Sequence, residues 1–194
     1  MGSESWIRKL GSYIMQPLVY LSFAFALSEM MLMFFKRSKK ANTKSRDDKG
    51  SLIFLWMMIT CGFFAAFVLS KPINQFWLGF GIPLIVAGLA IRWISIFQLG
   101  KSFTVDVAIN DTASLKMDGI YQKVRHPSYS GILLIVAGFA AIMSSIYSFL
   151  VLVVPVFIAI VYRISVEEKL LQSSFGKTYS DYKKETKKLI PGIY

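Results

Sequence analysis

Residues 119–131 of this 194-residue chain read Gly-Ile-Tyr-Gln-Lys-Val-Arg-His-Pro-Ser-Tyr-Ser-Gly. They include His126, the one histidine of the sequence, and they overlap the start of an apolar run over residues 129–147. A second apolar run, over residues 149–165, follows almost directly. Because so short a connection suits antiparallel neighbours, the two runs are predicted to form a tight helical hairpin. The polar stretch therefore lies at the mouth of a predicted hairpin.

Three further apolar runs precede this hairpin, over residues 13–35, 51–70 and 76–99. A bilayer core about 30 Å thick needs about 20 helical residues, and all five runs come near that length. The composition agrees, because 55% of the residues are hydrophobic and 17% are charged, whereas about a quarter is usual in soluble domains. The sequence therefore predicts an all-α, multi-pass integral membrane protein with five transmembrane helices.

The Lys and Arg residues lie mostly between these runs. Eighteen of the 22 fall in residues 36–49, in residues 101–125 or in the tail that begins at Arg163, and three fall on the opposite side. The positive-inside rule then places the amino terminus outside and the carboxyl tail in the cytoplasm. A net charge of +11 can also suggest nucleic acid, but the apolar load argues against a soluble nucleic-acid-binding protein.

The tail is expected to differ from the membrane runs. The fifth helix is predicted to leave the membrane near Arg163 and to continue to Gly176, a residue type that commonly ends helices. Tyr179 and Tyr182 lie three apart and so share one face if that segment is helical. The tail is therefore predicted to hold short amphipathic helices, and the apolar residues 189–193 to fold back on the body.

Ionised residues within or at the rim of membrane helices are candidates for function, because lipid is a costly place for them. Such residues lie at four places: Glu29, Arg92, the pair Arg125 and His126, and the set Arg163, Glu167 and Glu168. The hairpin brings the last two groups to one membrane level, since one begins a helix and the other ends one. A structural role stays open for Glu29 and for Arg92, which either snorkels or lines the site.

Several kinds of site are excluded by residue counts. One cysteine, Cys61, and one histidine leave no disulfide framework and none of the usual Cys/His metal sites. No Gly-x-Ser-x-Gly elbow is present for nucleophilic catalysis. What remains is a mixed-charge pocket open to the cytoplasm and to lipid. Such a pocket suits a charged soluble cofactor and an amphipathic substrate, without a metal.

Four segments of the second half carry a more specific signal: Leu115-Lys-Met-Asp-Gly-Ile-Tyr, Arg125-His-Pro-Ser-Tyr-Ser-Gly, Arg163-Ile-Ser-Val-Glu-Glu-Lys-Leu-Leu and Phe175-Gly-Lys-Thr-Tyr-Ser-Asp-Tyr. Together they resemble the isoprenylcysteine carboxyl methyltransferase family, in the form of a compact prokaryotic member. The Arg-His-Pro-x-Tyr core alone is also similar to phospholipid N-methyltransferases and to membrane sterol reductases. Residues 110–114 depart from the family's pattern.

The resemblance implies S-adenosyl-L-methionine as methyl donor, S-adenosyl-L-homocysteine as product, and an S-prenylated C-terminal cysteine as acceptor. Cofactor contacts carried over from the family fall on Leu115, Lys116, Tyr121, His126, Pro127, Ser128, Tyr129 and Glu167, with Ala113 and Ser114 beside them. Arg163 falls on the residue that meets the substrate carboxylate. The expected catalytic residues are Arg163, Arg125 and Glu167, where Glu167 holds the donor's ammonium and His126 or Arg125 its carboxylate.

On this resemblance the chain is expected to be an S-adenosylmethionine-dependent protein-S-isoprenylcysteine O-methyltransferase, with its active site facing the cytoplasm and membrane lipids around it. Residues 1–74 would form an N-terminal transmembrane hairpin, and residues 75–194 a catalytic region with three transmembrane helices, the cofactor loop and the tail. Three alternatives stay open. They are a methyltransferase for another lipid-borne acceptor such as a phospholipid amine, an NADPH-dependent sterol-type reductase, and a non-enzymatic membrane scaffold.

Overall fold

The computed structural model describes residues 20, 25, 27, 29–31, 46–71, 75–100 and 115–194. Within these ranges the elements are α2 (Arg46–Val68), α3 (Gln75–Leu99), the short 3-10 helix η2 (Gly119–Gln122), α4 (Pro127–Ile142) and α5 (Ile146–Glu185). The one β-type pairing in the described ranges is an isolated bridge between Val124 and Lys187. The predicted all-α fold is confirmed for this part of the chain.

In the part of the chain that the structure describes, three helices are long and apolar enough to cross a membrane, namely Gly50–Val68, Gln75–Leu99 and Ile146–Glu185. α4 is shorter, with 16 residues. α5 has 40 residues, about twice what a bilayer needs, so its polar half beyond Arg163 extends outside the apolar core. Most of the run at residues 13–35 lies outside the described residues, and the five spans and their orientation stay predictions.

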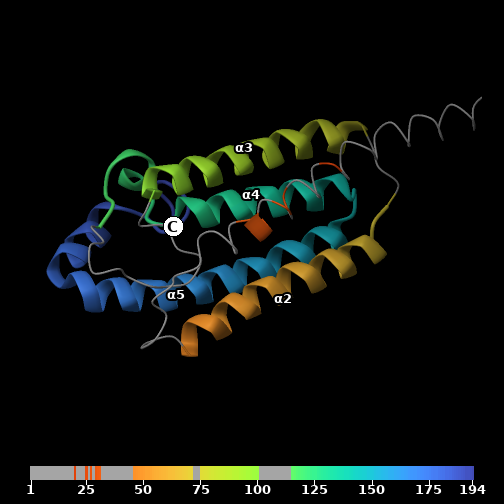
Figure 1. Cartoon of the computed structure of the whole chain (residues 1–194). Helices are drawn as coiled ribbons and strands as arrows, with labels where there is room; N and C mark the ends of the chain where they lie inside the picture. The colour runs from red at the N-terminus through yellow and green to blue at the C-terminus, as the bar shows by residue number, and fades with distance from the viewer. Residues whose placement is uncertain are drawn as a thin grey trace, which may run out of the picture. The chain divides into compact units, whose positions relative to one another are not determined.

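The chain divides into two compact units, Met1–Arg37 and Ser38–Tyr194. In the larger unit α2 packs along α5 and α3 packs along α4 (Figure 1). α4 and α5 form the predicted antiparallel hairpin, joined by residues 143–145. The predicted boundary between them was wrong by a few residues, because Tyr147 belongs to α5. Ser144 takes a positive φ of 53°, and the Ser145 hydroxyl caps the new helix by accepting from the Ser148 N–H.

The α3–α4 contact depends on glycine. A Cβ atom added to Gly88 would lie 2.6 Å from the carbonyl oxygen of Gly131, and one added to Gly138 would lie 2.6 Å from the carbonyl oxygen of Gly81. Real Cβ atoms do not approach backbone so closely, so any larger residue would push the two helices apart. Small residues at these positions allow the two backbones to meet directly.

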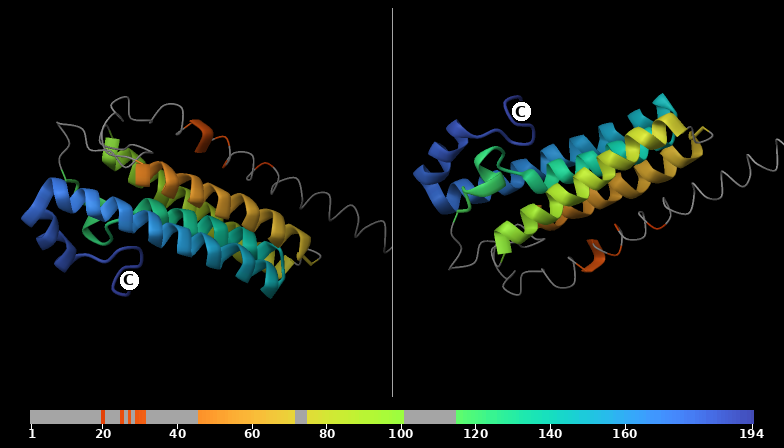
Figure 2. Two further views of the ribbon diagram at one scale, coloured as in Figure 1. Left: turned by 90° about the horizontal axis from the view of Figure 1, so that it is seen from below. Right: turned by 90° about the horizontal axis from the view of Figure 1, so that it is seen from above.

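α5 bends sharply at Gly176, whose φ of 51° and ψ of −120° interrupt the helical geometry. The amide of Gln172 spans the bend by donating to the Gly176 carbonyl and to the Ser180 hydroxyl, both at 2.9 Å. Beyond the bend the tail returns toward the bundle (Figure 2). Tyr179 and Tyr182 are both buried, which confirms the predicted shared face. Leu189 joins the apolar core, so the predicted fold-back of the terminus is also confirmed.

Candidate functional site

Ionisable side chains from three helices are buried near the end of the bundle where α4 begins. Arg92 of α3 is 7% exposed, His126 at the start of α4 is 4% exposed, and Arg163 of α5 is 1% exposed. A charge removed from water is costly unless other groups in the protein compensate for it. The contacts of these side chains therefore define the candidate site.

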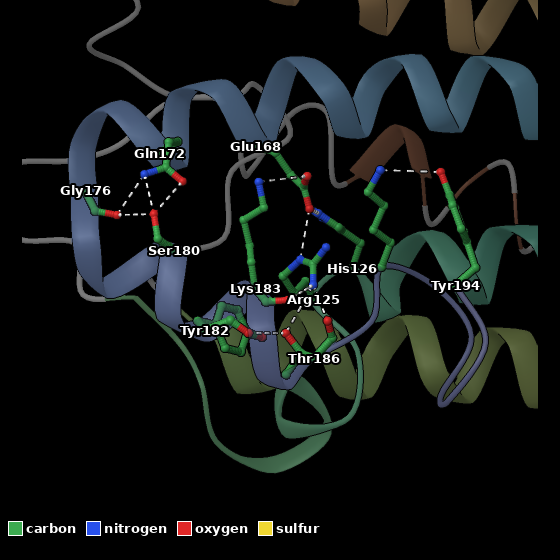
Figure 3. A network of polar contacts seen from close by, with 11 residues as sticks. Arg125, His126, Glu168, Gln172, Gly176, Ser180, Tyr182, Lys183, Thr186 and Tyr194 are labelled. Carbon is green, nitrogen blue, oxygen red and sulfur yellow. Dashed lines mark hydrogen bonds and ion pairs between the residues drawn. The ribbon is translucent and has the colours of Figure 1, made fainter.

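His126 meets the two glutamates of α5. Its Nε2 lies 3.4 Å from Glu168 Oε1 (Figure 3). Its Nδ1 lies 3.6 Å from Glu167 Oε2. His126 is the residue that precedes α4, and Pro127 occupies the first helical position, where its missing N–H costs nothing. The prediction that the hairpin brings the histidine to the polar end of the fifth helix is confirmed.

Arg125 fastens the tail to the start of α4. Its Nε donates to Glu168 Oε1 at 2.9 Å, and its Nη1 contacts the Lys183 carbonyl and both the carbonyl and hydroxyl oxygens of Thr186 (Figure 3). Backbone hydrogen bonds connect the same two segments, since the N–H groups of Arg125 and His126 donate to the carbonyls of Lys187 and Lys188 at 2.8 and 3.0 Å. We call residues 183–188 the tail strap. The strap fixes the two residues that begin the site.

Glu168 lies between Arg125 and His126, and no role was predicted for it from the sequence. Burial by itself raises the pKa of Glu168, but hydrogen bonds from His126 and Arg125 outweigh it and hold the pKa at about 2, below the usual 4.5. Glu168 is therefore a carboxylate at neutral pH. As an acceptor for both neighbours, it ties the histidine and the arginine to α5.

Two buried tyrosines connect η2 to its surroundings. The Tyr121 hydroxyl donates to the Ser95 carbonyl of α3 at 3.2 Å, and the Tyr182 hydroxyl donates to the Tyr121 carbonyl at 2.6 Å. Burial raises the pKa of Tyr182 to about 12 and raises the pKa of Tyr121 well above its usual range. Both phenols stay protonated and serve as donors, so the tail helix and η2 are held to the bundle together.

Arg163 is the most enclosed cation of the site. Its Nη1 donates to the Ser51 hydroxyl of α2 at 2.6 Å, a partner 112 residues away in the sequence. Tyr129 connects it to the rest of the site, because the Tyr129 hydroxyl adjoins Arg163 and Glu167 while the Tyr129 ring lies 5.9 Å from the His126 ring. Arg163, Glu167, Tyr129 and His126 thus form one cluster.

The family model described as "Isoprenylcysteine carboxyl methyltransferase (ICMT) family" matches residues 81–173, which include most of α3, all of α4 and the first part of α5. Protein-S-isoprenylcysteine O-methyltransferase B of Arabidopsis thaliana is 30% identical over 135 residues, 68% of this chain and 68% of the relative. The chain belongs to the isoprenylcysteine carboxyl methyltransferase family. The predicted resemblance is confirmed.

Two further similarities help to define this family member. A solved structure of the eukaryotic intramembrane Ras methyltransferase of this family has a TM-score of 0.69 at 21% identity, over 94% of this chain and 68% of that one, and so shares the fold. A methanethiol S-methyltransferase of a Pseudomonas species is 34% identical over 123 residues, 61% of this chain and 45% of the relative. Related chains therefore carry names with different methyl acceptors.

The remaining predicted site residues have contacts of their own, where the structure describes them. Ser128 accepts from Arg92 Nη1 at 2.8 Å, so Arg92 reaches the first turn of α4. Lys116 pairs with Asp118 at 2.9 Å, and the hydrogen bond from Lys116 lowers the pKa of that carboxyl. Leu115 is half-buried and Pro127 is buried. Ala113 and Ser114 lie outside the described residues.

One acceptor in the cluster is left unsatisfied. Glu167 Oε2 is buried and finds no hydrogen-bond partner among the described residues, since His126 Nδ1 at 3.6 Å is beyond bonding distance. A buried carboxylate oxygen normally has a donor. Within this family fold, Glu167 therefore presents an anionic acceptor that suits a cationic ligand group.

Sequence reasoning missed Ser51, because a serine at the start of an apolar run gives no sign of its partner. It also did not expect a hollow of about 360 Å³ on the tail, lined by Met117, Lys177, Thr178, Asp181, Tyr182 and Glu185. None of the predicted site residues that the structure describes lines this hollow. The buried cluster, and not this hollow, is therefore the candidate site.

Proposed function

We propose that this chain is an S-adenosyl-L-methionine-dependent O-methyltransferase for the α-carboxylate of an S-prenylated C-terminal cysteine, acting at the cytoplasmic face of the membrane. Membership in the family supports methyl transfer, and the similar plant proteins are named protein-S-isoprenylcysteine O-methyltransferases. The observation that carries the proposal is the cluster of Arg163, Tyr129, Glu167 and His126. It puts the buried guanidinium of Arg163 in one cluster with a glutamate whose Oε2 is buried, at one end of a membrane bundle.

Arg163 is the proposed partner of the acceptor carboxylate. An α-carboxylate has a pKa of about 3.5, so it is ionised at neutral pH and needs no general base. A guanidinium binds a carboxylate in one plane through two parallel hydrogen bonds, which fixes the attacking oxygen. Because Arg163 is buried, that contact is less weakened by water than a surface pair would be. The prenyl chain stays in the lipid beside the helices.

Glu167 and His126 are the proposed partners of the methyl donor. The free Oε2 of Glu167 fits the donor's ammonium group, and the donor supplies a methyl group activated on a sulfonium when bound. The rings of Tyr121 and Tyr129 offer aromatic faces that stabilise a sulfonium. These side chains have to align the carboxylate oxygen with the methyl group and exclude water, which is where rate acceleration by positioning arises.

Arg125 and Glu168 are the proposed positioning residues of this site. Arg125 binds Glu168 and the strap, and Glu168 lies against His126, so together they fix the orientation of the histidine ring. The role is supported by the fact that Arg125 Nε and Nη1 bind groups of the protein itself. Substitution of Arg125 or Glu168 is therefore expected to displace the His126 ring more than it displaces Arg163.

Methyl transfer and donor binding test this proposal. Purified protein in detergent is titrated with S-adenosyl-L-homocysteine by calorimetry and assayed for base-labile methyl ester on a farnesylated cysteine mimic. We expect binding and ester formation, and no ester on the matched mimic with an amidated carboxyl. Binding of NADPH in place of S-adenosyl-L-homocysteine would contradict the proposal and favour a sterol-type reductase. Binding of neither would favour a scaffold.

A thiol acceptor is the second candidate, because of the 34% identity to a methanethiol S-methyltransferase. A thiol carries no carboxylate for Arg163 to hold, whereas the donor site is unchanged. Methanethiol and the farnesylated mimic are therefore compared in wild type and in Arg163→Ala. Loss of activity on the mimic alone assigns Arg163 to the carboxylate. Activity on methanethiol and none on the mimic would contradict the first proposal in favour of a thiol acceptor. Activity on a phospholipid amine and none on the mimic would contradict it in favour of an amine acceptor.

A further inference from the structure

Residues 189–194 form a compact turn that pairs part of its own backbone. The N–H groups of Leu189 and Ile190 donate to the Tyr194 oxygen at 2.7 and 2.8 Å, and those of Ile193 and Tyr194 donate to the Ile190 oxygen, both at 3.1 Å. The Leu189 carbonyl accepts from the Ser130 hydroxyl at 2.6 Å. In lipid an unpaired backbone group costs several kcal/mol, whereas water would satisfy it. These bonds therefore lower the cost of moving this part of the turn out of water.

The side chains of the turn present an apolar surface. Ile190 is 47% exposed and Ile193 is 76% exposed, while Leu189 anchors the turn in the core. The ring of Tyr194 lies 6.4 Å from the ring of Phe157, which is itself exposed on the flank of α5. Phe157 precedes Arg163 by six residues, or about 9 Å along a helix. The apolar turn therefore lies on the bundle's flank at the depth of the apolar half of α5.

A basic segment leads into this turn. Between Gly176 and Leu189 the chain carries five lysines, of which four are exposed and one is half-buried: Lys177, Lys183, Lys184, Lys187 and Lys188. Two acidic residues, Asp181 and Glu185, offset them only in part. Each basic residue close to an anionic membrane strengthens binding about fivefold. A basic segment followed by exposed apolar side chains is the composition of an interfacial membrane anchor.

We propose that residues 189–194 insert into the leaflet on the site's side of the membrane, while the lysines of residues 177–188 bind anionic lipid headgroups. The occupant of this surface is an anionic bilayer, because the charge is complementary and the turn continues the lipid-facing flank of α5. The same lysine segment contains the strap, whose carbonyls hold the backbone of Arg125 and His126. Anionic lipid therefore stabilises the strap and, through it, the start of the site. The coupling to the site rests on the proposed function, whereas the insertion does not.

The insertion is tested on the full chain with Cys61→Ser and Ile193→Cys, labelled with an environment-sensitive fluorophore. The protein is placed in nanodiscs of phosphatidylcholine, with or without phosphatidylglycerol. We expect quenching by lipids brominated on their acyl chains, little quenching by aqueous iodide, and a larger inserted fraction with phosphatidylglycerol. Iodide quenching that is strong in both lipid mixtures would overturn the proposal.

The role of charge is tested with two matched variants of the labelled protein. The first variant combines Lys177→Gln, Lys184→Gln and Lys187→Gln. It should lower the ratio of inserted to exposed label roughly tenfold or more in anionic nanodiscs, and much less in neutral ones. The same three positions changed to Arg keep the charge and should keep the insertion. Equal behaviour of the Gln and Arg variants would overturn the role of the lysines.

The coupling has a separate readout in the affinity for S-adenosyl-L-homocysteine, measured in both nanodiscs. We expect tighter binding with phosphatidylglycerol and loss of that gain in the Gln variant. Equal affinity in both lipids, with the label inserted, would overturn the coupling alone. Absence of binding in every lipid would contradict the proposed function, while the quenching result still decides the insertion.

Discussion

The middle of the helical bundle and its polar end are held together by opposite means. In the middle, Gly88 of α3 meets Gly131 of α4 so closely that the two backbones touch. At the polar end, long charged side chains reach across, as Arg163 does to Ser51 and Arg125 does to Glu168. In lipid, apolar side chains gain little by leaving the solvent, so close packing provides the attraction between helices. The middle thus provides stability without polar groups, and the polar end places charges where they can act on a ligand.

The largest expected effect is on the polar end. Arg163→Ala removes the proposed partner of the acceptor carboxylate, and breaking a buried ion pair costs about 3–5 kcal/mol, so methyl transfer to the farnesylated mimic should fall by roughly 100- to 4,000-fold. Affinity for S-adenosyl-L-homocysteine should change little, as calorimetry will show. Arg163→Lys is the control that keeps the charge without the planar fork, and partial activity is expected. Loss of donor binding in Arg163→Ala would contradict the division of roles.

The second effect is on stability and depends on pH. Glu168 has a pKa of about 2 in the folded chain and about 4.5 when unfolded, so its carboxylate stabilises the fold fully above pH 4.5. That contribution, about 3 kcal/mol at most, is lost as the pH falls from 4.5 toward 2. In thermal unfolding in detergent, the melting temperature of the wild type should therefore lie well above that of Glu168→Gln at neutral pH. The two melting temperatures should converge in acid. A gap that stays constant with pH would contradict this assignment.

The third effect tests the middle of the bundle. In Gly88→Ala the new Cβ would lie 2.8 Å from the backbone nitrogen of Ile135 as well as against Gly131, so α3 and α4 have to separate. Overpacking of this kind costs about 1–3 kcal/mol, and the better helix propensity of alanine returns less than about 1 kcal/mol. Gly79→Ala, on the same helix with nothing within 4 Å, is the matched control and should be neutral or slightly stabilising. Equal melting temperatures for both variants would show that the backbone contact is unimportant.

The smallest effect separates donor binding from acceptor binding at the polar end. Glu167→Gln removes the charge of the free acceptor but keeps its shape, so affinity for S-adenosyl-L-homocysteine should fall about tenfold, or about 1.4 kcal/mol. Lys169→Gln, an exposed change two residues along α5, is the control and should bind normally. Unchanged affinity in Glu167→Gln would remove this residue from the donor site.

Much of the architecture could be read from the sequence, because each signal was local. The lengths of the apolar runs predicted the positions of α2, α3 and the hairpin. Gly176 marked the position of the bend, because glycine tolerates a positive φ. The division at residue 74 and the orientation in the membrane remain predictions. The boundary between α4 and α5 was missed because a serine turn within two apolar runs does not change their hydropathy. The positive φ of Ser144, which interrupts the helical backbone, sets this boundary in the structure.

The sequence by itself determined that polar groups gather where the hairpin opens, since an apolar helix can place charge only near its ends at low cost. The tertiary structure decided which groups meet. Ser51 became the partner of Arg163, and the carbonyls of the strap became the partners of Arg125. These pairings depend on how each helix is rotated against its neighbour. A helix that is apolar on every side carries no amphipathic pattern to specify that rotation, so close packing between glycines and the returning tail specified it instead.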